Sequence, residues 1–296
     1  MKKKNILITG PSGLVGTKII SKFLNLEYNL ICIYRNVVPK DFRNIKKIRW
    51  VKCDLENEEF EIHNIKKFYA AILLCGQTNN KNISSEQYIK SNVITLQNTL
   101  NSIGSKTDRI IFASTQYVYG NPNNLNIKES HKTQSEFNSY SFSKLRAENI
   151  LKQHQKKFYG MYISFRLPGF IGGGGNIDYI INKAKKNEDI ILFSNGSVCR
   201  DYITFDYAFD IIAKTLSQKI KNGFFIFNVG SGQKISSIDI AKKVCKTTNS
   251  KSKIILSDKK PEIEDCILNN NKLRRFIDIK NLDLSNEIIS HALNHD

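Results

Sequence analysis

Two side chains with the right spacing for proton chemistry are Tyr140 and Lys144. They lie four residues apart in a segment, 139–155, whose spacing predicts a helix, so both are expected on one helix face. A tyrosine needs a lowered pKa to exchange protons near neutral pH, and a nearby ammonium group favours the phenolate. Thr115, with Ser114 beside it, ends a strand-like run and offers a hydroxyl for a substrate oxygen. The group predicts acid/base catalysis, although an isolated Tyr-x-x-x-Lys pair is also typical of an exposed helix face.

A glycine-rich turn near the start of the chain suits a phosphate ligand. The stretch 9–16 reads Thr-Gly-Pro-Ser-Gly-Leu-Val-Gly, follows the apolar run 6–8 and precedes a segment with helical spacing. Gly10 permits a tight turn, Gly13 lets the backbone approach a pyrophosphate, and Gly16 carries no side chain that would hold the helix off the strand. The helix N-terminus adds unpaired N–H groups and a positive dipole end. The turn predicts a dinucleotide site, although such turns also occur without a ligand.

Strand-like apolar runs alternate with longer helical patterns through roughly the first two thirds of the chain. This alternation predicts a doubly wound parallel sheet with helices on both faces, a Rossmann-like α/β fold. The expected strands are 5–9, 30–34, 48–53, 70–74, 109–113 and 161–166, and the expected helices include 84–103, with Ser84 as its cap, and 139–155. The candidate motifs lie at strand ends or on the following helices, where ligands bind in such sheets.

The pattern loosens after Gly169. We expect a dinucleotide-binding domain over 1–168 and a smaller substrate-binding lobe over 169–296, partly interleaved with the sheet. Expected elements in the lobe are helices 177–186, 207–218 and 236–246, strands 190–193 and 224–229, and a segment 200–205. The four-glycine loop 172–175 is either a plain flexible connection or a loop that faces the substrate.

The charge and the cysteine content of the chain indicate which binding partners and which cellular compartment to expect. The formal charge of +18 could attract nucleic acid or a diphosphate, but the lysines are spread along the chain and aromatic residues do not interleave with them. We therefore expect no nucleic-acid partner. The six cysteines form no close pair, which predicts no disulfide framework, no metal site and a reducing cytoplasm. The lysine-rich start is followed by an apolar run too short for a signal peptide, and no run could span a membrane.

The chain resembles the extended short-chain dehydrogenases/reductases of the nucleotide-sugar epimerase/dehydratase family. Several stretches match motifs of this family and occur in the same order along most of the chain. They are the glycine-rich turn, Asp54-Leu55, Tyr88-Ile89-Lys90-Ser91-Asn92-Val93, Phe112-Ala113-Ser114-Thr115-Gln116-Tyr117-Val118-Tyr119-Gly120, Tyr140-Ser141-Phe142-Ser143-Lys144, Arg200-Asp201-Tyr202-Ile203 and Asn228-Val229-Gly230-Ser231-Gly232. The last twenty or so residues match weakly.

The resemblance implies a role for each matching residue. Thr115 would be the catalytic hydroxyl, Tyr140 the acid/base, and Lys144 the group that holds the nicotinamide ribose and lowers the tyrosine pKa. The implied cofactor-binding residues are Gly10, Gly13, Leu14, Val15, Gly16, Arg35, Asp54, Leu55, Cys75, Gly76, Gln77 and Asn92, together with Tyr140 and Lys144. Thr115, Gln116 and Arg200 would bind a nucleotide-diphosphate sugar, with the arginine fork on the diphosphate. A homodimer through the helices beginning near Ser84 and Ser139 is also implied.

Two departures from the family pattern bear on cofactor and reaction. NAD-using members usually carry an aspartate at the end of the second strand, where Arg35 stands here. An arginine could pair with a 2′-phosphate, which favours NADP over NAD, unless Arg35 stacks on the adenine of either cofactor. Dehydratases of the family carry Asp-Glu after the catalytic threonine, and Gln116-Tyr117 in that place disfavours dehydration.

Two reactions remain, and both use Thr115, Tyr140 and Lys144 in the same way. Arg35 and the short chain favour hydride-transfer reduction of a 4-keto sugar nucleotide, with Tyr140 protonating the new alkoxide. The alternative is an NAD-dependent nucleotide-sugar 4-epimerase. From a different class, the chain could be a non-catalytic nucleotide- or RNA-binding member of the same fold, which the charge of +18 motivates and the intact catalytic residues disfavour.

Overall fold

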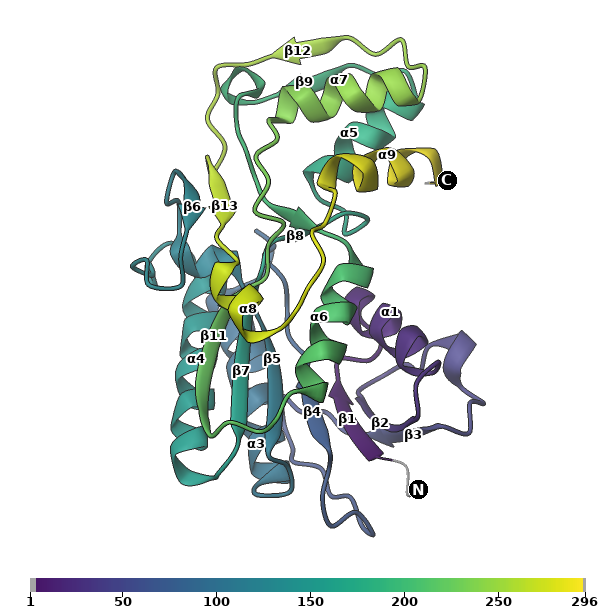
Figure 1. The fold of residues 1–296 in the computed structure, drawn as a ribbon, viewed down its shortest axis with the longest axis vertical. Helices are drawn as coiled ribbons and strands as arrows, with labels where there is room; N and C mark the ends of the chain where they lie inside the picture. The colour runs from purple at the N-terminus through teal and green to yellow at the C-terminus, as the bar shows by residue number, and fades with distance from the viewer. Residues whose placement is uncertain (1–3, 295–296) are drawn as a thin grey trace. The chain divides into compact units, whose positions relative to one another are not determined.

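The computed structural model describes residues 4–294, and the chain divides into two compact units (Figure 1). The first unit contains the residues up to Val118, then Thr133–Arg166 and Ile212–Phe227. The second contains Tyr119–Lys132, Leu167–Ile211 and the residues from Asn228 onward. The predicted boundary after residue 168 lies two residues from the break after Arg166. The first three residues, which enter the signal-peptide argument, lie outside the described residues.

A seven-stranded sheet forms the centre of the first unit, in the order β11-β7-β5-β4-β1-β2-β3. The strands are β1 (Lys4–Thr9), β2 (Tyr28–Tyr34), β3 (Ile48–Lys52), β4 (Ala70–Leu73), β5 (Arg109–Thr115), β7 (Met161–Leu167) and β11 (Gly223–Asn228). β1 runs parallel to both β2 and β4, so the chain winds outward from β1 in two directions. This arrangement confirms the predicted doubly wound α/β fold.

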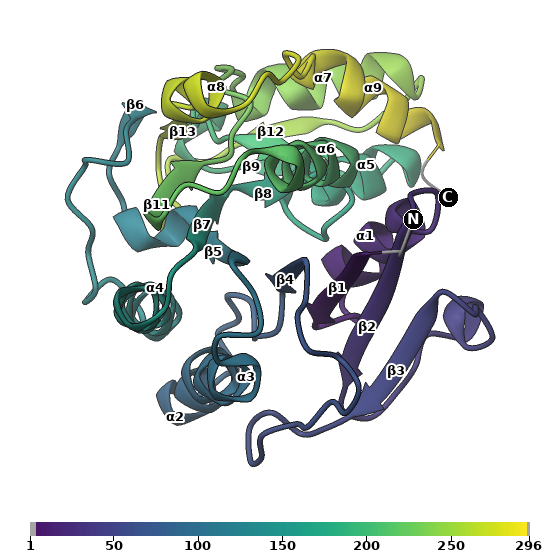
Figure 2. The same ribbon diagram turned by 60° about the horizontal axis from the view of Figure 1, so that its bottom comes forward.

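Helices cover both faces of this sheet, with α1 on one face and α3 and α4 on the other (Figure 2). The helices are α1 (Leu14–Phe23), α2 (Ser85–Tyr88), a π-helical turn (Ile89–Ile94), α3 (Thr95–Ile103) and α4 (Ser139–Lys157), with short 3-10 turns at Lys40–Phe42 and Gln116–Tyr119. Leu96, Leu100 and Leu151 pack from α3 and α4 onto buried strand residues such as Leu7 and Phe112. The predicted helix 84–103 is confirmed, with Ser84 as its cap, but the π turn interrupts it.

The second unit contains three two-stranded parallel sheets, β10-β8, β12-β9 and β13-β6. Its strands are β6 (Asn124–Ile127), β8 (Gly169–Phe170), β9 (Ile190–Leu192), β10 (Tyr202–Ile203), β12 (Ile254–Leu256) and β13 (Cys266–Leu268), and its helices are α5 (Asn176–Lys185), α7 (Ser237–Thr247), α8 (Asn271–Phe276) and α9 (Leu284–Asn294). Helix α6 (Phe205–Ser217) contributes residues to both units. Isoleucines of α5, α7 and α9 form the core. No helix among residues 4–294 has the length and apolar character needed to cross a bilayer.

Candidate functional site

The glycine-rich turn joins β1 to α1 with the geometry that a pyrophosphate needs. Gly10 has a φ of +69°, and a β-carbon added there would lie 2.8 Å from the backbone nitrogen of Cys75. A β-carbon at Gly16 would overlap the carbonyl oxygen of Gly10, so only glycine lets α1 begin this close to the strand. Among residues 4–294, no side chain caps the N-terminus of α1, and its first turn contains no acidic residue. The helix N-terminus therefore offers N–H groups to an anion.

A pocket of about 220 Å³ lies at the carboxyl ends of β1, β2, β3 and β4. It brings together eight of the predicted cofactor residues: Gly10, Gly13, Arg35, Asp54, Leu55, Cys75, Gly76 and Gln77. Pro11 and Ser12 of the predicted glycine-rich turn also line it. The remaining walls come from residues that were not predicted as cofactor-binding: Ile33, Tyr34, Cys53, Glu56, Leu74, Ser91 and Thr95. Leu14 and Val15 lie in the first turn of α1 outside this lining, and Asn92 lies behind Gly76.

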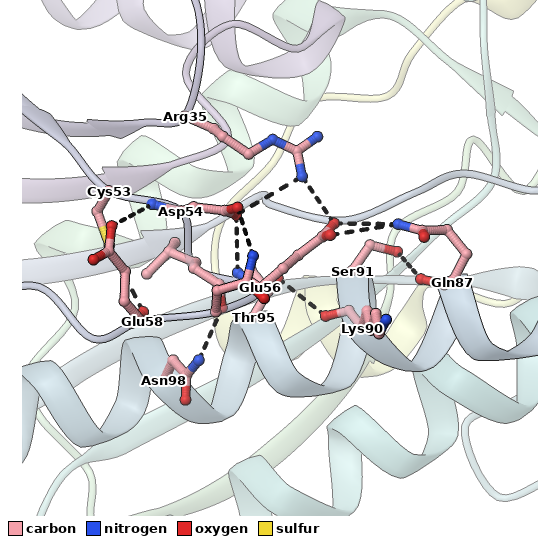
Figure 3. A network of polar contacts seen from close by, with 12 residues as sticks. Arg35, Cys53, Asp54, Glu56, Glu58, Gln87, Lys90, Ser91, Thr95 and Asn98 are labelled. Atoms are coloured by element: carbon pink, nitrogen blue, oxygen red, sulfur yellow. Dashed lines mark hydrogen bonds and ion pairs between the residues drawn. The ribbon is translucent and has the colours of Figure 1, made fainter.

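Arg35, at the mouth of this pocket, is held by two carboxylates (Figure 3). Its Nη1 atom lies 3.1 Å from Oε1 of Glu56 and 3.8 Å from Oδ1 of Asp54. The Asp54 carboxylate also accepts hydrogen bonds from the Glu56 backbone and from the Asn57 side chain. The guanidinium on which the NADP prediction rests is therefore already paired within the protein.

Thr115 and Tyr140 meet in the first unit. β5 runs two residues further than predicted and ends at Thr115, whose side chain hydrogen-bonds Tyr140 and accepts the backbone N–H of Tyr117. The ring of Tyr140 lies between those of Tyr88 and Tyr117, with centroid separations of 5.7 and 5.8 Å. Gln116 is buried in the turn that follows. The structure therefore brings together a hydroxyl and a phenol that the sequence separates by a loop.

The environment of Tyr140 favours its protonated form. Burial raises the pKa of Tyr140 above its ordinary value, and the neighbouring Tyr117 and Tyr88 raise it further. The hydrogen bond with Thr115 lowers the pKa but does not offset the burial. In the protein alone, Tyr140 therefore holds its proton at neutral pH and is poised as a proton donor.

Lys144 lies one turn further along α4 and is also buried. Its Nζ donates a hydrogen bond to the carbonyl oxygen of Ala113 at 3.0 Å and lies 4.9 Å from the centre of the Phe112 ring. Burial lowers the pKa of Lys144 to about 8, against the opposing effects of Cys75 and Glu148. Lys144 thus keeps a proton at neutral pH while anchored to the end of β5.

Two buried polar atoms near Gly76 and Thr115 have no hydrogen-bond partner among residues 4–294. They are Oδ1 of Asn92 and Oγ of Ser114. Oδ1 of Asn92 lies so close to Gly76 that a β-carbon there would overlap it. Both atoms are enclosed by protein, and neither residue lines the pocket. The pocket and the uncapped helix fit a dinucleotide.

Arg200 belongs to the second unit. Its Nη2 donates a hydrogen bond to the carbonyl oxygen of Ile263, and its backbone forms a bridge with Cys266. Its Nε is buried and has no hydrogen-bond partner in the described part of the chain. One donor of the guanidinium is thus used within the lobe.

Part of what the sequence reasoning missed carries a recognisable signal. Glu56 follows the Asp54-Leu55 pair that marks the end of β3, so it shares their strand end. Ser91 and Thr95 lie about one helical turn apart, so they share one side of the helix. The pairing of Glu56 with Arg35 has no local signal, because the two residues follow different strands.

Comparisons with known proteins identify the family of the chain. The family model described as "NAD dependent epimerase/dehydratase family" matches residues 6–230. A putative UDP-glucose 4-epimerase of Methanocaldococcus jannaschii is 29% identical over 246 residues, covering 78% of each chain. The dTDP-4-dehydro-6-deoxyglucose reductase of Escherichia coli is 26% identical over 256 residues, covering 79% of each.

A similar fold occurs in a UDP-glucuronic acid 4-epimerase from Bacillus cereus, solved in complex with UDP-glucuronic acid and NAD. Its TM-score to this chain is 0.82 at 17% identity, covering 97% of this chain and 96% of that one. That likeness shows the shared fold, while the family match covers most of this chain together with its dinucleotide turn and the Thr115, Tyr140 and Lys144 group. The chain therefore belongs to the NAD-dependent epimerase/dehydratase family.

Proposed function

We propose that this protein is a nicotinamide-dependent nucleotide-sugar oxidoreductase that reduces a 4-keto sugar nucleotide. The observation that carries the proposal is the placement of the buried Tyr140 of α4 beside Thr115 at the carboxyl end of β5. A nicotinamide dinucleotide, when bound, supplies hydride transfer. The E. coli relative, by its name, acts on a 4-dehydro sugar nucleotide and supports this substrate class.

The chain's own residues supply binding and proton chemistry. Tyr140 gives its proton to the oxygen on C4, and Thr115 hydrogen-bonds the same oxygen and aligns it. Lys144, one turn from Tyr140 on α4, holds the ribose of the nicotinamide. Gln116 contacts the sugar, and the Arg200 guanidinium takes part in holding the diphosphate.

A 4-epimerase is the second candidate, and a specific observation favours it. The sequence favoured net reduction partly because a free Arg35 suits NADP, but Arg35 is paired with Glu56 and Asp54. NAD suits an epimerase, which returns its cofactor to the starting redox state. The M. jannaschii relative, by its name, and the B. cereus structure support this class. With the NADP argument removed, reduction remains the first candidate on Tyr140 as a proton donor and on the substrate class of the E. coli relative.

Cofactor stoichiometry separates them. The purified protein would be incubated with NADH or NADPH and a panel of nucleotide 4-keto-6-deoxy sugars and ordinary nucleotide hexoses. One NAD(P)H consumed for each keto sugar converted identifies a reductase and names its substrate. Interconversion of two hexoses without net loss of cofactor identifies an epimerase. Binding of cofactor without conversion of any sugar contradicts both candidates on this panel.

We also propose a homodimer in the cytoplasm. Residues at the starts of α2 and α4 line a pocket of about 470 Å³, and Phe142 at its edge is 42% exposed. The other lining residues are mainly polar, so the exposed ring of Phe142 is the feature that suits a helix-to-helix contact with a second copy. All six cysteines are free thiols, which suits a reducing compartment.

A further inference from the structure

The strongest unassigned feature of the pocket is the cluster of Arg35, Asp54 and Glu56 (Figure 3). All three line the pocket, and they come from the ends of two neighbouring strands, β2 and β3. One guanidinium and two carboxylates leave a net charge of −1. This charge faces the place where family members discriminate between an adenosine ribose and its 2′-phosphate.

Glu56 is fixed from both ends. Its backbone N–H donates to Oδ1 of Asp54 at 3.2 Å, and both of its carboxylate oxygens lie 3.4 Å from Nε2 of Gln87. Gln87 lies in α2, and its backbone N–H donates a hydrogen bond to the hydroxyl of Ser84, the N-cap of that helix. The Glu56 side chain is only 16% exposed, whereas that of Arg35 is 47% exposed. Arg35 is the more exposed partner of the pair, and Glu56 is the more buried one.

A 2′-phosphate would compete with Glu56 for Arg35. To grip the phosphate with its fork, the guanidinium would have to leave a largely buried carboxylate without its cation, which is costly. A phosphate of about two negative charges would also approach two carboxylates. A 2′-hydroxyl meets neither penalty and can donate a hydrogen bond to a carboxylate.

We propose that Glu56, by holding Arg35, makes this protein select NAD over NADP. The inference rests on the proposed function, because it assumes that a nicotinamide dinucleotide binds in this pocket. It assigns to Glu56 a specificity role that acts through Arg35, so removing the Glu56 charge frees the guanidinium for a 2′-phosphate.

The test is a binding measurement on the full chain. Trp50 is the single tryptophan, and its ring lies 6.0 Å from that of Tyr34 in the pocket wall, so its fluorescence reports NADH or NADPH binding. We expect wild-type protein to bind NADH more tightly than NADPH. Glu56→Gln should shift the ratio of dissociation constants toward NADPH by about tenfold, a change of about 1.4 kcal/mol.

Two further variants isolate the cause. Glu58→Gln is the matched control, because it removes a carboxylate of the same segment that lies outside the pocket lining. The Glu58 carboxylate accepts a hydrogen bond from the Asp54 backbone N–H, and its removal should leave the NADH-to-NADPH ratio of dissociation constants as in wild type. Glu56→Gln combined with Arg35→Ala should lose the NADPH gain. A wild-type preference for NADPH, or an unchanged ratio in Glu56→Gln with tight NADH binding retained, overturns this inference alone. Binding of neither dinucleotide by the wild type overturns the proposed function as well.

Discussion

Asn92 and Ser143, 51 residues apart in the chain, are joined by a buried hydrogen bond of 2.9 Å from the Asn92 amide to the Ser143 hydroxyl. Asn92 lies in the π-helical turn, and Ser143 lies in α4 between Tyr140 and Lys144. The Ser143 hydroxyl donates in turn to the Tyr140 carbonyl oxygen at 2.7 Å. The irregular turn is therefore tied directly to the part of α4 that contains Tyr140 and Lys144.

Loss of this tie should destabilise the protein. Asn92→Ala removes the donor to Ser143, and we expect the free energy of unfolding to fall by about 1–3 kcal/mol in urea denaturation. Gln97→Ala, on an exposed position of α3, is the matched control and should change it by less than about 0.5 kcal/mol. Equal effects of the two substitutions would show that the hydrogen bond contributes nothing special.

The buried Lys144 predicts a pH dependence of stability. Its pKa of about 8 in the folded protein lies below its ordinary value of 10.5, so the unfolded chain binds a proton that the folded protein lacks between these values. The free energy of unfolding should therefore gain a contribution from Lys144 as the pH rises from about 8 to about 10. Denaturation of wild type and Lys144→Met across this window measures the contribution as their difference.

The control for this pH effect is Lys152→Met, which removes an exposed lysine from the same helix. It should keep the pH dependence of the wild type. Parallel pH profiles for wild type and Lys144→Met would mean that burial does not lower the pKa of Lys144.

The close contact at the glycine-rich turn predicts a steric cost. In Gly16→Ala the new methyl group would overlap the Gly10 carbonyl oxygen, and the backbone cannot yield as a flexible side chain can. We expect a loss of about 1–3 kcal/mol in the free energy of unfolding, together with weaker dinucleotide binding. Gly175→Ala is the control, because open space surrounds that position and its φ is −90°. A fully stable Gly16→Ala protein would exclude the close approach of α1 to the turn.

The proposed dimer contact predicts a change in mass. Phe142→Asp places a charge on the exposed face of α4 and should convert a dimer into a monomer in analytical ultracentrifugation. Tyr159→Asp changes an aromatic residue that is 66% exposed beyond the end of α4, and it should leave the mass unchanged. A monomeric wild-type protein would contradict the proposed homodimer.

The sequence was sufficient for the sheet and for the placement of Tyr140 and Lys144 on one helix. The runs that became β1, β2, β4 and β7 are apolar almost throughout because these strands are buried on both faces, which makes their positions readable. Tyr140 and Lys144 were correctly predicted to lie on one helix, α4, where residues four apart share a face. The short strands β6, β12 and β13 were not predicted, because three or four residues carry too little periodicity.

Contacts between distant residues could not be predicted from local patterns. The position of Arg35 at the end of β2 was predicted, but its partner Glu56 reaches it only because β3 pairs with β2. Similarly, a lysine near a tyrosine suggested a lowered tyrosine pKa, whereas the burial that raises the pKa of Tyr140 depends on packing from several segments. Electrostatics at this site follows from tertiary structure.

The most direct test compares wild type with Tyr140→Phe on the nucleotide-sugar panel, with NADH present and products identified by mass spectrometry and NMR. Wild type should convert one sugar nucleotide at C4, and Tyr140→Phe should convert none while binding NADH nearly as tightly as wild type. Tyr159→Phe, on the protein surface, should keep the wild-type rate. Conversion by Tyr140→Phe at an undiminished rate would contradict the assignment of Tyr140 as the acid/base. If wild type binds NADH but changes no sugar at C4, the assignment of a nucleotide-sugar oxidoreductase is contradicted as well.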